Sequence, residues 1–306
     1  MKIFLFHRVS PERDPLWDPM SPKLFDATIE YIKRKYTIIQ LEKFLLNKKN
    51  DHSNTEKYAA IVFDDGYKDF LEYALPVLKK HECPASMYIV TDCVNKQSPP
   101  WTYILDYHFT HSKKLNIPFN LNLLPSHLKT TTFKDVKERM EFAKIFKPFL
   151  KTTPNQQRVE LYETVISALN DVTIPDGLIM NWNELKQIKA EGIEIGSHSV
   201  SHPLLAKIET IAELTNELIN SGQTIEKNLG HFPITISYPI GSYNEQVKKI
   251  ASENGYKIGL AVNQISYQSK LHDQFEIPRI ELYNESFFKT KLRISGIVQT
   301  INNWRR

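Results

Sequence analysis

The sequence predicts an α/β fold, a (β/α) barrel of about seven strands that is irregular in outline. Short apolar runs rich in β-branched and aromatic residues recur along the 306-residue chain, and segments with helical periodicity separate them. This alternation indicates a parallel sheet with crossover helices. A helical stretch without strands, at about residues 101–178, predicts an insertion within an otherwise single catalytic domain that spans residues 1–306.

The first hundred residues contain four of the predicted strands. The run at 61–63 is the central one, because it is strongly apolar and is followed by two carboxylates and Gly66. Ser21 is a suitable N-cap for the first helix, with Pro22 in the first helical position. In chain order we expect strands at 3–6, 36–39, 61–63 and 85–90, and helices at 22–32, 41–47 and 70–81.

The second half of the chain begins with the insertion. Helical periodicity is clear at 133–150 and 157–169, and the strand–helix alternation resumes after Gly177. Asn181 is a suitable N-cap for the next helix, and Gly192 marks its end. We expect strands at 193–195, 234–238, 258–262 and 277–282, and helices at 182–190, 212–229 and 244–254.

Composition is that of an ordinary globular protein, with 41% hydrophobic and 24% charged residues. The net charge is +4, and residues 286–306 carry five basic side chains and no acid. Basic charge is therefore not spread over a face that would bind nucleic acid. Cys83 and Cys93 are too few for a disulfide framework and fit buried thiols in a reducing compartment.

The N-terminal sequence lacks the long apolar region of a secretory signal, because His7 and Arg8 interrupt an apolar run of only four residues. No run approaches the ~20 apolar residues of a membrane span. We therefore expect a cytoplasmic protein. The basic and apolar residues of 286–306 would allow weak contact with the inner face of a membrane. Alternatively, this segment is a closing helix packed on the barrel with a solvated basic face.

Two adjacent carboxylates, Asp64 and Asp65, end the central strand. Like charges in contact are costly unless a cation lies between them. Neighbouring side chains of a strand point to opposite faces, so one carboxylate can bind a metal while the other accepts a proton. The alternative is a plain polar turn, since Asp-Gly is a common turn dipeptide.

Two histidines four residues apart, His198 and His202, follow the strand at 193–195. This spacing allows both rings to face one metal ion. With an aspartate they would complete a set of two histidines and one carboxylate, which leaves coordination positions open for water and substrate. The alternative is that both are ordinary hydrogen-bonded histidines.

Further polar residues occupy predicted strand ends. His7 ends the first strand, where a general acid is one interpretation and a satisfied core histidine another. Arg279 lies in an apolar strand and needs a buried partner, for which an ionised aspartate is suitable, although a surface ion pair is possible. The turn at 237–241 places Pro239 and Gly241 at a strand end, where a turned backbone can direct N–H groups at a developing oxyanion; the alternative is a plain turn. Trp101 either stacks on a sugar ring or packs in the core.

Together these residues resemble the polysaccharide deacetylase family, whose members share the homology domain of the NodB chitooligosaccharide deacetylases. The sequence Phe63-Asp64-Asp65-Gly66 is similar to the first family motif, and His198-Ser199-Val200-Ser201-His202 to the second. Tyr238-Pro239-Ile240-Gly241 is similar to the third. The resemblance covers about residues 1–100 and 178–285. It implies a distorted (β/α) barrel of about seven strands.

The resemblance also implies roles for these residues. Asp65, His198 and His202 would bind a divalent metal, which is zinc in most members. Asp64 would be the general base that activates a metal-bound water, and the Ile240 N–H, beside Tyr238, would help to hold the oxyanion. A general acid would then protonate the leaving amine.

The sequence departs from the family pattern at two places. Ser237 stands where the third motif usually has an arginine, and we expect Arg279 to supply that guanidinium. No histidine motif is found near the C-terminus. His7 matches the branch that resembles poly-N-acetylglucosamine deacetylases, in which this motif lies on the N-terminal strand.

We therefore expect a metal-dependent hydrolase that removes N-acetyl groups from an amino sugar in a glycan or in a lipid-linked precursor of a surface polysaccharide. Two alternatives stay open at this point. One is a hydrolase of a non-sugar amide or ureide, as in allantoinase-like relatives. The other is a non-catalytic glycan-binding protein. Oligomeric state, and whether the insertion is a lid or an interface, are not predicted.

Overall fold

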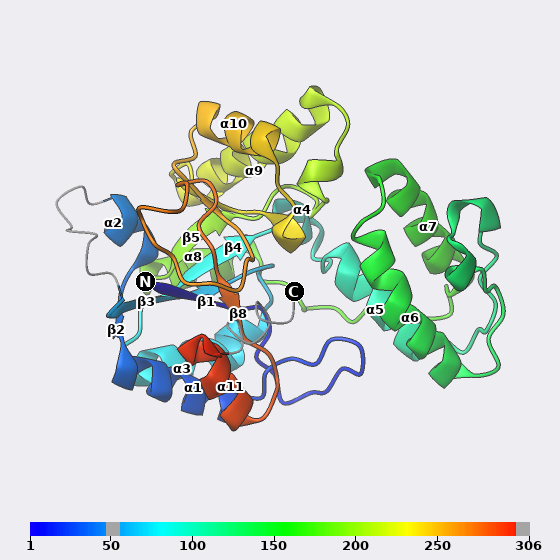
Figure 1. Ribbon diagram of the computed structural model, residues 1–306, viewed down its shortest axis with the longest axis horizontal. Coiled ribbons are helices and arrows are strands. Elements are labelled where there is room, and N and C mark those ends of the chain that lie inside the picture. The colour runs from blue at the N-terminus through cyan, green and yellow to red at the C-terminus, as the bar shows by residue number, and fades with distance from the viewer. Residues whose placement is uncertain (47–55, 298–306) are drawn as a thin grey trace.

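A curved parallel sheet forms the centre of the computed structural model, which describes residues 1–46 and 56–297 (Figure 1). Its strand order is β7-β6-β5-β4-β3-β1-β8, and β2 pairs with β3 beside β4. Every pair is parallel, as expected when helices connect the strands. The strands are β1 (Lys2–Phe6), β2 (Thr37–Ile38), β3 (Tyr58–Phe63), β4 (Ser86–Ile89), β5 (Glu194–Ser197), β6 (Thr235–Ser237), β7 (Ile258–Leu260) and β8 (Ile280–Glu281).

The last strand closes the sheet into a barrel. Ile277 bridges to Leu260 of β7, and its N–H donates to the carbonyl of Gly259 at 2.9 Å. Three residues later the same segment pairs with β1 as β8. A single short segment thus contacts both edges of the sheet, which gives the closed but distorted (β/α) barrel that the sequence predicts.

Helices surround this barrel. In Figure 1, α9 and α10 lie on one side of the sheet, and α1, α3 and α11 lie on the other. Those of the barrel are α1 (Pro22–Lys35), α2 (Leu41–Leu46), α3 (Leu75–Lys80), α4 (Thr91–Lys96), α8 (Trp182–Ala190), α9 (Ile211–Leu229), α10 (Glu245–Glu253) and α11 (Phe287–Ser295). The insertion adds α5 (Trp101–His111), α6 (Val136–Leu150) and α7 (Asn155–Ala168).

The predicted helix starts at Ser21 and Asn181 are confirmed. The Ser21 hydroxyl accepts a hydrogen bond from the Leu24 N–H at 3.3 Å, and Pro22 occupies the first helical position. Asn181 forms a full capping box with Glu184. Such caps satisfy the free N–H groups of the first turn, which is why short polar residues mark these boundaries.

The predicted helix at 70–81 is interrupted by a change of helix type. Residues Phe70–Ala74 form a π-helical turn, in which the Leu75 N–H donates to the Phe70 carbonyl, and α3 follows. Pro76 lies in the first turn of α3. Proline has no N–H and crowds the carbonyl four residues earlier, so a regular α-helix cannot run through this point.

Alternate residues of the central strands face two different cores. On β3, Ile61 and Phe63 share an apolar cluster with helix α1, whereas Ala60 and Val62 face the barrel interior. A side chain two positions beyond Val62 also faces inward, because the period of a strand is two. Asp64 is therefore directed into the barrel at the carboxyl end of β3.

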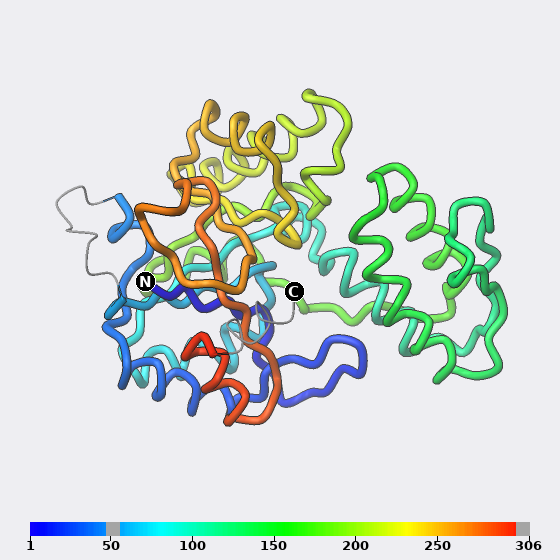
Figure 2. Tube along the Cα trace, viewed as in Figure 1, coloured from blue at the N-terminus to red at the C-terminus, as the bar shows by residue number. Residues whose placement is uncertain are grey.

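The insertion contains three helices around its own apolar cluster. The chain leaves the barrel after α4 and returns before α8 (Figure 2). A buried arginine, Arg139, holds the base of this cluster by donating to the carbonyls of Phe109 at 3.1 Å, Ser112 at 2.6 Å and Lys114. The principal apolar residues of the cluster are Trp101, Leu105, Phe109, Phe142, Phe146 and Leu161.

The C-terminal segment packs on the barrel over its described part. Helix α11 lies against α1, with Ile294 fully buried, while Phe288 is 66% exposed. Residues 298–306, and with them the end of the predicted membrane-contact segment, lie outside the described residues. Within 1–46 and 56–297, the structure has no helix of the length and apolar character needed to cross a membrane.

Candidate active site

The residues that follow the strands meet around one cavity of about 140 Å³ at the carboxyl rim of the barrel. His7 follows β1, Asp64 and Asp65 follow β3, and His198 follows β5. The insertion forms the opposite wall. The complete lining consists of Leu5, His7, Trp17, Asp64, Asp65, Thr102, Asp106, Lys147, Lys151, His198, His202, Ile240, Val262 and Glu281.

Asp65, His198 and His202 form a buried cluster on this rim. The candidate ligand atoms of the three side chains all lie within 4.8 Å of one another. His198 Nε2 is 3.5 Å from Asp65 Oδ1, and His202 Nε2 is 3.4 Å from the same oxygen. The Nδ1–H of His198 donates to the Ser237 carbonyl at 2.7 Å, which leaves the Nε2 lone pair directed at the cluster.

This donor set fits a divalent metal ion. Asp65 Oδ1 is buried and has no hydrogen-bond partner among the described residues, although it faces two imidazoles. Burial raises the pKa of Asp65, while His7 and His198 oppose that change. A buried carboxylate without a partner is costly, and a cation between it and two neutral imidazoles removes that cost. One carboxylate and two histidines are ligands typical of zinc and similar ions.

The backbone at two of these residues is left-handed. Asp65 has φ 77° and His202 has φ 61°, and neither is a glycine. Such conformations are unfavourable for residues with a Cβ and persist where the surrounding structure holds them. They direct both side chains toward the same point of the cavity.

Asp64 lies in a buried network beside this cluster. Arg279 Nη1 donates to Asp64 Oδ1 at 2.8 Å, and Nη2 donates to the Ser237 hydroxyl at 2.8 Å. That hydroxyl donates in turn to Asp64 Oδ2 at 3.0 Å. Burial by itself would raise the pKa of Asp64, but the Arg279 guanidinium and His198 outweigh it and hold this pKa below its usual range. The predicted contact between Arg279 and the base candidate is present, and Ser237 bridges the two.

His7 lies on the same cavity beside a carboxylate. Its Nδ1 is 3.6 Å from Glu281 Oε1, and its ring meets the Trp17 ring edge-on at 5.2 Å between centroids. Both partners hold the imidazole at the cavity wall, within reach of a molecule bound there.

The three remaining predicted residues occupy different places. Ile240 lines the cavity. Its backbone has a left-handed conformation, with φ 58°. Tyr238 is buried away from the cavity, and its hydroxyl donates to the Phe275 carbonyl at 3.1 Å.

Trp101 is not among the residues that line the cavity, and its ring packs in the core of the insertion, as the core-packing alternative expects. The indole packs in the insertion, where the Arg158 guanidinium lies 4.7 Å from its centroid. Its Nε1–H donates to the His202 carbonyl at 2.9 Å. The residue therefore supports the loop that carries a candidate metal ligand.

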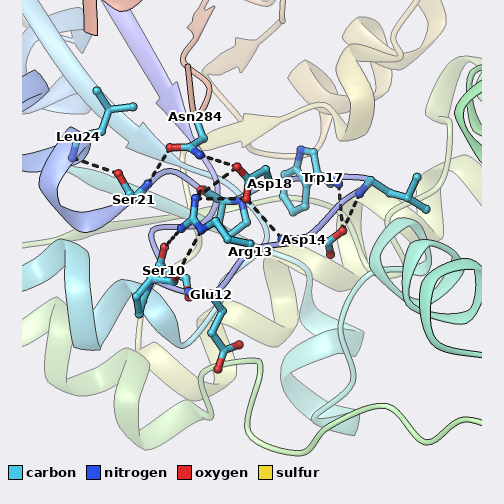
Figure 3. A network of polar contacts seen from close by, with 12 residues as sticks. Ser10, Glu12, Arg13, Asp14, Trp17, Asp18, Ser21, Leu24 and Asn284 are labelled. Carbon is cyan, nitrogen blue, oxygen red and sulfur yellow. Dashed lines mark hydrogen bonds and ion pairs between the residues drawn. The ribbon is translucent and has the colours of Figure 1, made fainter. Parts of the chain in front are cut away.

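Trp17 is the aromatic residue that faces the cavity, and the sequence did not single it out. It lies in the loop between β1 and α1, which a polar network fixes in place (Figure 3). Asp14 Oδ1 accepts the N–H groups of Leu16 and Trp17 at 2.9 and 3.1 Å. Asn284 donates to Asp18 and accepts the Ser21 N–H, which ties the loop to the segment after β8.

Glu281, Asp106, Lys147 and Lys151 also line the cavity without having been predicted. Three of them belong to the insertion, far in sequence from the strand-end motifs. Only the packing of α5 and α6 against the barrel brings them there. A cluster of charged residues in two helices is ordinarily a solvated face, so the sequence carries little signal for them.

Comparison with known proteins assigns the family. Residues 51–259 match the family model described as polysaccharide deacetylase. The peptidoglycan-N-acetylglucosamine deacetylase PgdA of Listeria monocytogenes is 28% identical over 153 residues, which is 49% of this chain and 31% of that protein. The chain thus matches about a third of the length of this curated relative.

Solved structures of low sequence identity share the fold. The Streptococcus pyogenes deacetylase PplD, solved in complex with acetate, has a TM-score of 0.60 at 19% identity, with 96% of each chain covered. A de-N-acetylase from Aggregatibacter actinomycetemcomitans has a TM-score of 0.59 at 16% identity, covering 95% of this chain and 97% of that one.

Proposed function

Because this chain belongs to the polysaccharide deacetylase family, we propose that it is a metal-dependent hydrolase that removes N-acetyl groups from an amino sugar of a glycan or a lipid-linked glycan precursor. The observation that carries the proposal is the juxtaposition of two carboxylates with different surroundings. Asp65 faces two histidines at 3.4 and 3.5 Å, and Asp64 faces a buried guanidinium at 2.8 Å. A protein that only binds glycans needs no ionised base beside a metal-type cluster.

A divalent cation bound by Asp65, His198 and His202 would supply Lewis-acid polarisation of the amide carbonyl and a lowered pKa for water. Asp64 then accepts the proton of the attacking water. Arg279 and Ser237 occupy both of its oxygens, and the guanidinium keeps the carboxylate ionised in a buried position. The same contacts fix its orientation, so little rearrangement is needed when the proton moves.

Two other residues at the strand ends of the barrel, Ile240 and His7, provide the two remaining functions. The backbone N–H of Ile240, held in a left-handed turn, stabilises the oxyanion. His7 donates a proton to the leaving amine, and Glu281 lies 3.6 Å from its Nδ1 and holds the ring at the cavity wall. The hydrogen bond from the Tyr238 hydroxyl to the Phe275 carbonyl holds the start of this turn in place.

Elemental analysis of purified protein, combined with acetate release from N-acetylglucosamine oligomers, tests this proposal. We expect near-stoichiometric zinc in the wild type, loss of the metal in His198→Ala, and acetate release by the wild type alone. Metal binding with no acetate from N-acetyl sugars, but with hydrolysis of ureides, would replace the proposed substrate class. Absence of metal even after addition of zinc would overturn the mechanism.

The cellular location and the membrane contact of residues 286–306 stay predictions. Flotation with anionic liposomes at low salt, with the chain ending at residue 297 as the comparison, tests the membrane contact. A salt-sensitive association that depends on residues 298–306 would support it. Failure of the full chain to associate with the liposomes at low salt would end it.

A further inference from the structure

The last turn of α6 brings two lysines to the wall of the proposed active site. Lys147 and Lys151 both line the cavity that contains Asp64 and Asp65. They are four residues apart, so they lie on the same face of the helix end. No step of the proposed hydrolysis uses either of them.

The charge of Lys147 is already balanced. Its ammonium is hydrogen-bonded to Asp106 Oδ2, and the Asp106 side chain is 3% exposed. Burial raises the pKa of Asp106 to about 6, an effect that Lys147 opposes. The two groups therefore form a nearly neutral pair that fixes the end of α6 against α5.

The charge of Lys151 is not balanced in this way. Its side chain makes no hydrogen bond or ion pair with any residue that the structure describes, and it reaches solvent at the cavity mouth. Enough protein surrounds the amine that desolvation lowers its pKa, and Lys147 lowers it further, against the opposing effects of Glu281, Asp106 and Asp65. An anion beside this amine would raise the pKa of Lys151 and so oppose both effects.

The other charged groups of the cavity have partners within the described residues. Asp64 has Arg279, Asp106 has Lys147, and Glu281 lies beside His7. Asp65 has the cation of the proposed function. Among the residues that the structure describes, Lys151 is then a positive charge at the mouth of the cavity without an ion-pair partner.

We propose that Lys151 binds an anionic group of the substrate, while the Lys147–Asp106 pair fixes the helix end that carries it. The preferred substrate is then an N-acetylated amino sugar that carries a phosphate or carboxylate close to the acetamido group. This inference rests on the proposed function and narrows its substrate class. A cavity of about 140 Å³ holds the acetamido group and the adjoining edge of one sugar ring. The anionic substituent then lies at the mouth, where Lys151 is exposed. Lysine suits either anion, because an ammonium recognises charge rather than planar geometry.

Steady-state kinetics on matched substrates test the inference with the metal-loaded full chain. The substrates are a neutral N-acetylglucosamine oligomer, N-acetylglucosamine 1-phosphate and N-acetylmuramic acid, so that the phosphate and carboxylate arms are separate. The variants are Lys151→Met and, as a matched control, Lys144→Met. Lys144 lies on the same helix, exposed, paired with Glu141 and outside the cavity.

We expect the wild type to have a higher kcat/KM on one of the anionic substrates than on the neutral one. Lys151→Met should reduce this ratio by about tenfold or more, mainly through KM, as the loss of a charge-assisted contact implies. Added salt should also reduce the ratio of kcat/KM on the anionic substrate to that on the neutral one in the wild type. Lys144→Met should leave the ratio unchanged. An equal kcat/KM on neutral and anionic substrates, or a ratio that Lys151→Met does not alter, overturns the inference and leaves the deacetylase proposal intact.

Isothermal titration calorimetry with the two anionic substrates distinguishes failure of the deacetylase proposal from failure of the proposed anion site at Lys151. If the metal-loaded wild type releases acetate from no substrate, the deacetylase proposal fails. Binding of an anionic sugar that weakens about tenfold in Lys151→Met would still support the anion site. Binding of equal strength in both proteins would overturn it.

Discussion

Asp64 and Asp65 are neighbours in the sequence, yet their surroundings separate their chemistry. Both side chains are almost fully buried, with 2% and 3% exposure. Arg279 compensates one charge, and the other faces only imidazoles within the described residues. Strand geometry alone predicts opposite orientations for the pair, but it does not say which partner each one finds.

Substitution of Arg279 by glutamine tests the electrostatic part of this arrangement. Without the guanidinium, burial raises the pKa of Asp64 against only the weaker opposition of His198 and His7, so a smaller share of the base is ionised. Acetate release should fall about 10²- to 10⁴-fold, and the free energy of unfolding in urea by roughly 3–5 kcal/mol. Arg293→Gln, which breaks a partly buried pair with Glu285 outside the cavity, is the control and should leave acetate release unchanged. An Arg279→Gln protein with unchanged acetate release would show that the guanidinium is not needed to keep the base ionised.

Trp101 gives a second test at the scale of one residue. The change Trp101→Phe keeps an aromatic ring in the core and removes the N–H that holds the His202 carbonyl. Zinc affinity, measured by competition with a chelator, should fall about tenfold, as for other groups that orient a metal ligand. Trp182→Phe removes a comparable bond to Asn95 away from the site and should not alter the affinity.

Prediction of single residues succeeded where a motif fixed the position. The carboxylates and histidines at strand ends lie together as expected, and Arg279 reaches Asp64. Trp101 and Trp17 show the limit. Both are aromatic and near the site in the fold, but the side that an indole faces depends on neighbouring helices and loops.

At the scale of elements, the insertion is a second packed unit attached to the barrel. Its helix α5 was not predicted as a separate helix, because its residues are apolar on most sides and give little amphipathic periodicity. Helices α6 and α7 were predicted within a few residues, α6 from its apolar residues at helical spacing.

Arg139→Met should loosen this unit selectively. Three carbonyls, one in the last turn of α5 and two just after the helix, would lose their donor, at a cost of roughly 2–5 kcal/mol. Hydrogen–deuterium exchange should accelerate in peptides from α5 and α6 while β3 and β4 stay protected. The exposed Lys137→Met on the same helix is the control. Uniform acceleration throughout the barrel would instead show that the insertion and the barrel unfold together.

At the scale of the whole molecule, the barrel depends on pairing between distant parts of the chain. β1 lies between β3 and β8, and the segment before β8 also contacts β7. The strand–helix rhythm predicts the parallel class. The closure was harder to predict, because β8 has two residues and its pairing depends on three-dimensional register rather than on local preference.

Global stability should fall as pH rises through the slightly acid range, partly because of Glu42 at the amino end of the barrel. Burial raises its pKa to about 7, with a contribution from Glu194 and an opposing hydrogen bond from Thr235, against an ordinary value of 4.5. Between these two pH values the folded protein binds more protons than the unfolded chain, so the free energy of unfolding decreases with rising pH. The loss should be no more than about 3 kcal/mol.

Urea denaturation of the wild type and Glu42→Gln at pH 4.5 and pH 8 checks this sign. Glutamine keeps an acceptor for the Thr235 hydroxyl and cannot ionise, so the variant should be the more stable protein at the higher pH. The two proteins should converge at the lower one. A wild type that gains stability relative to the variant as pH rises would contradict the raised pKa.

The closing segment has a consequence for synthesis on the ribosome. Arg279 follows Asp64 by 215 positions, so the base candidate leaves the exit tunnel long before its guanidinium has been translated. A nascent chain that stops before Arg279 lacks both β8, the last barrel contact, and the charge that keeps Asp64 ionised. The proposed hydrolysis therefore requires translation at least as far as Arg279, and a chain that stops earlier should be inactive as well as incompletely folded.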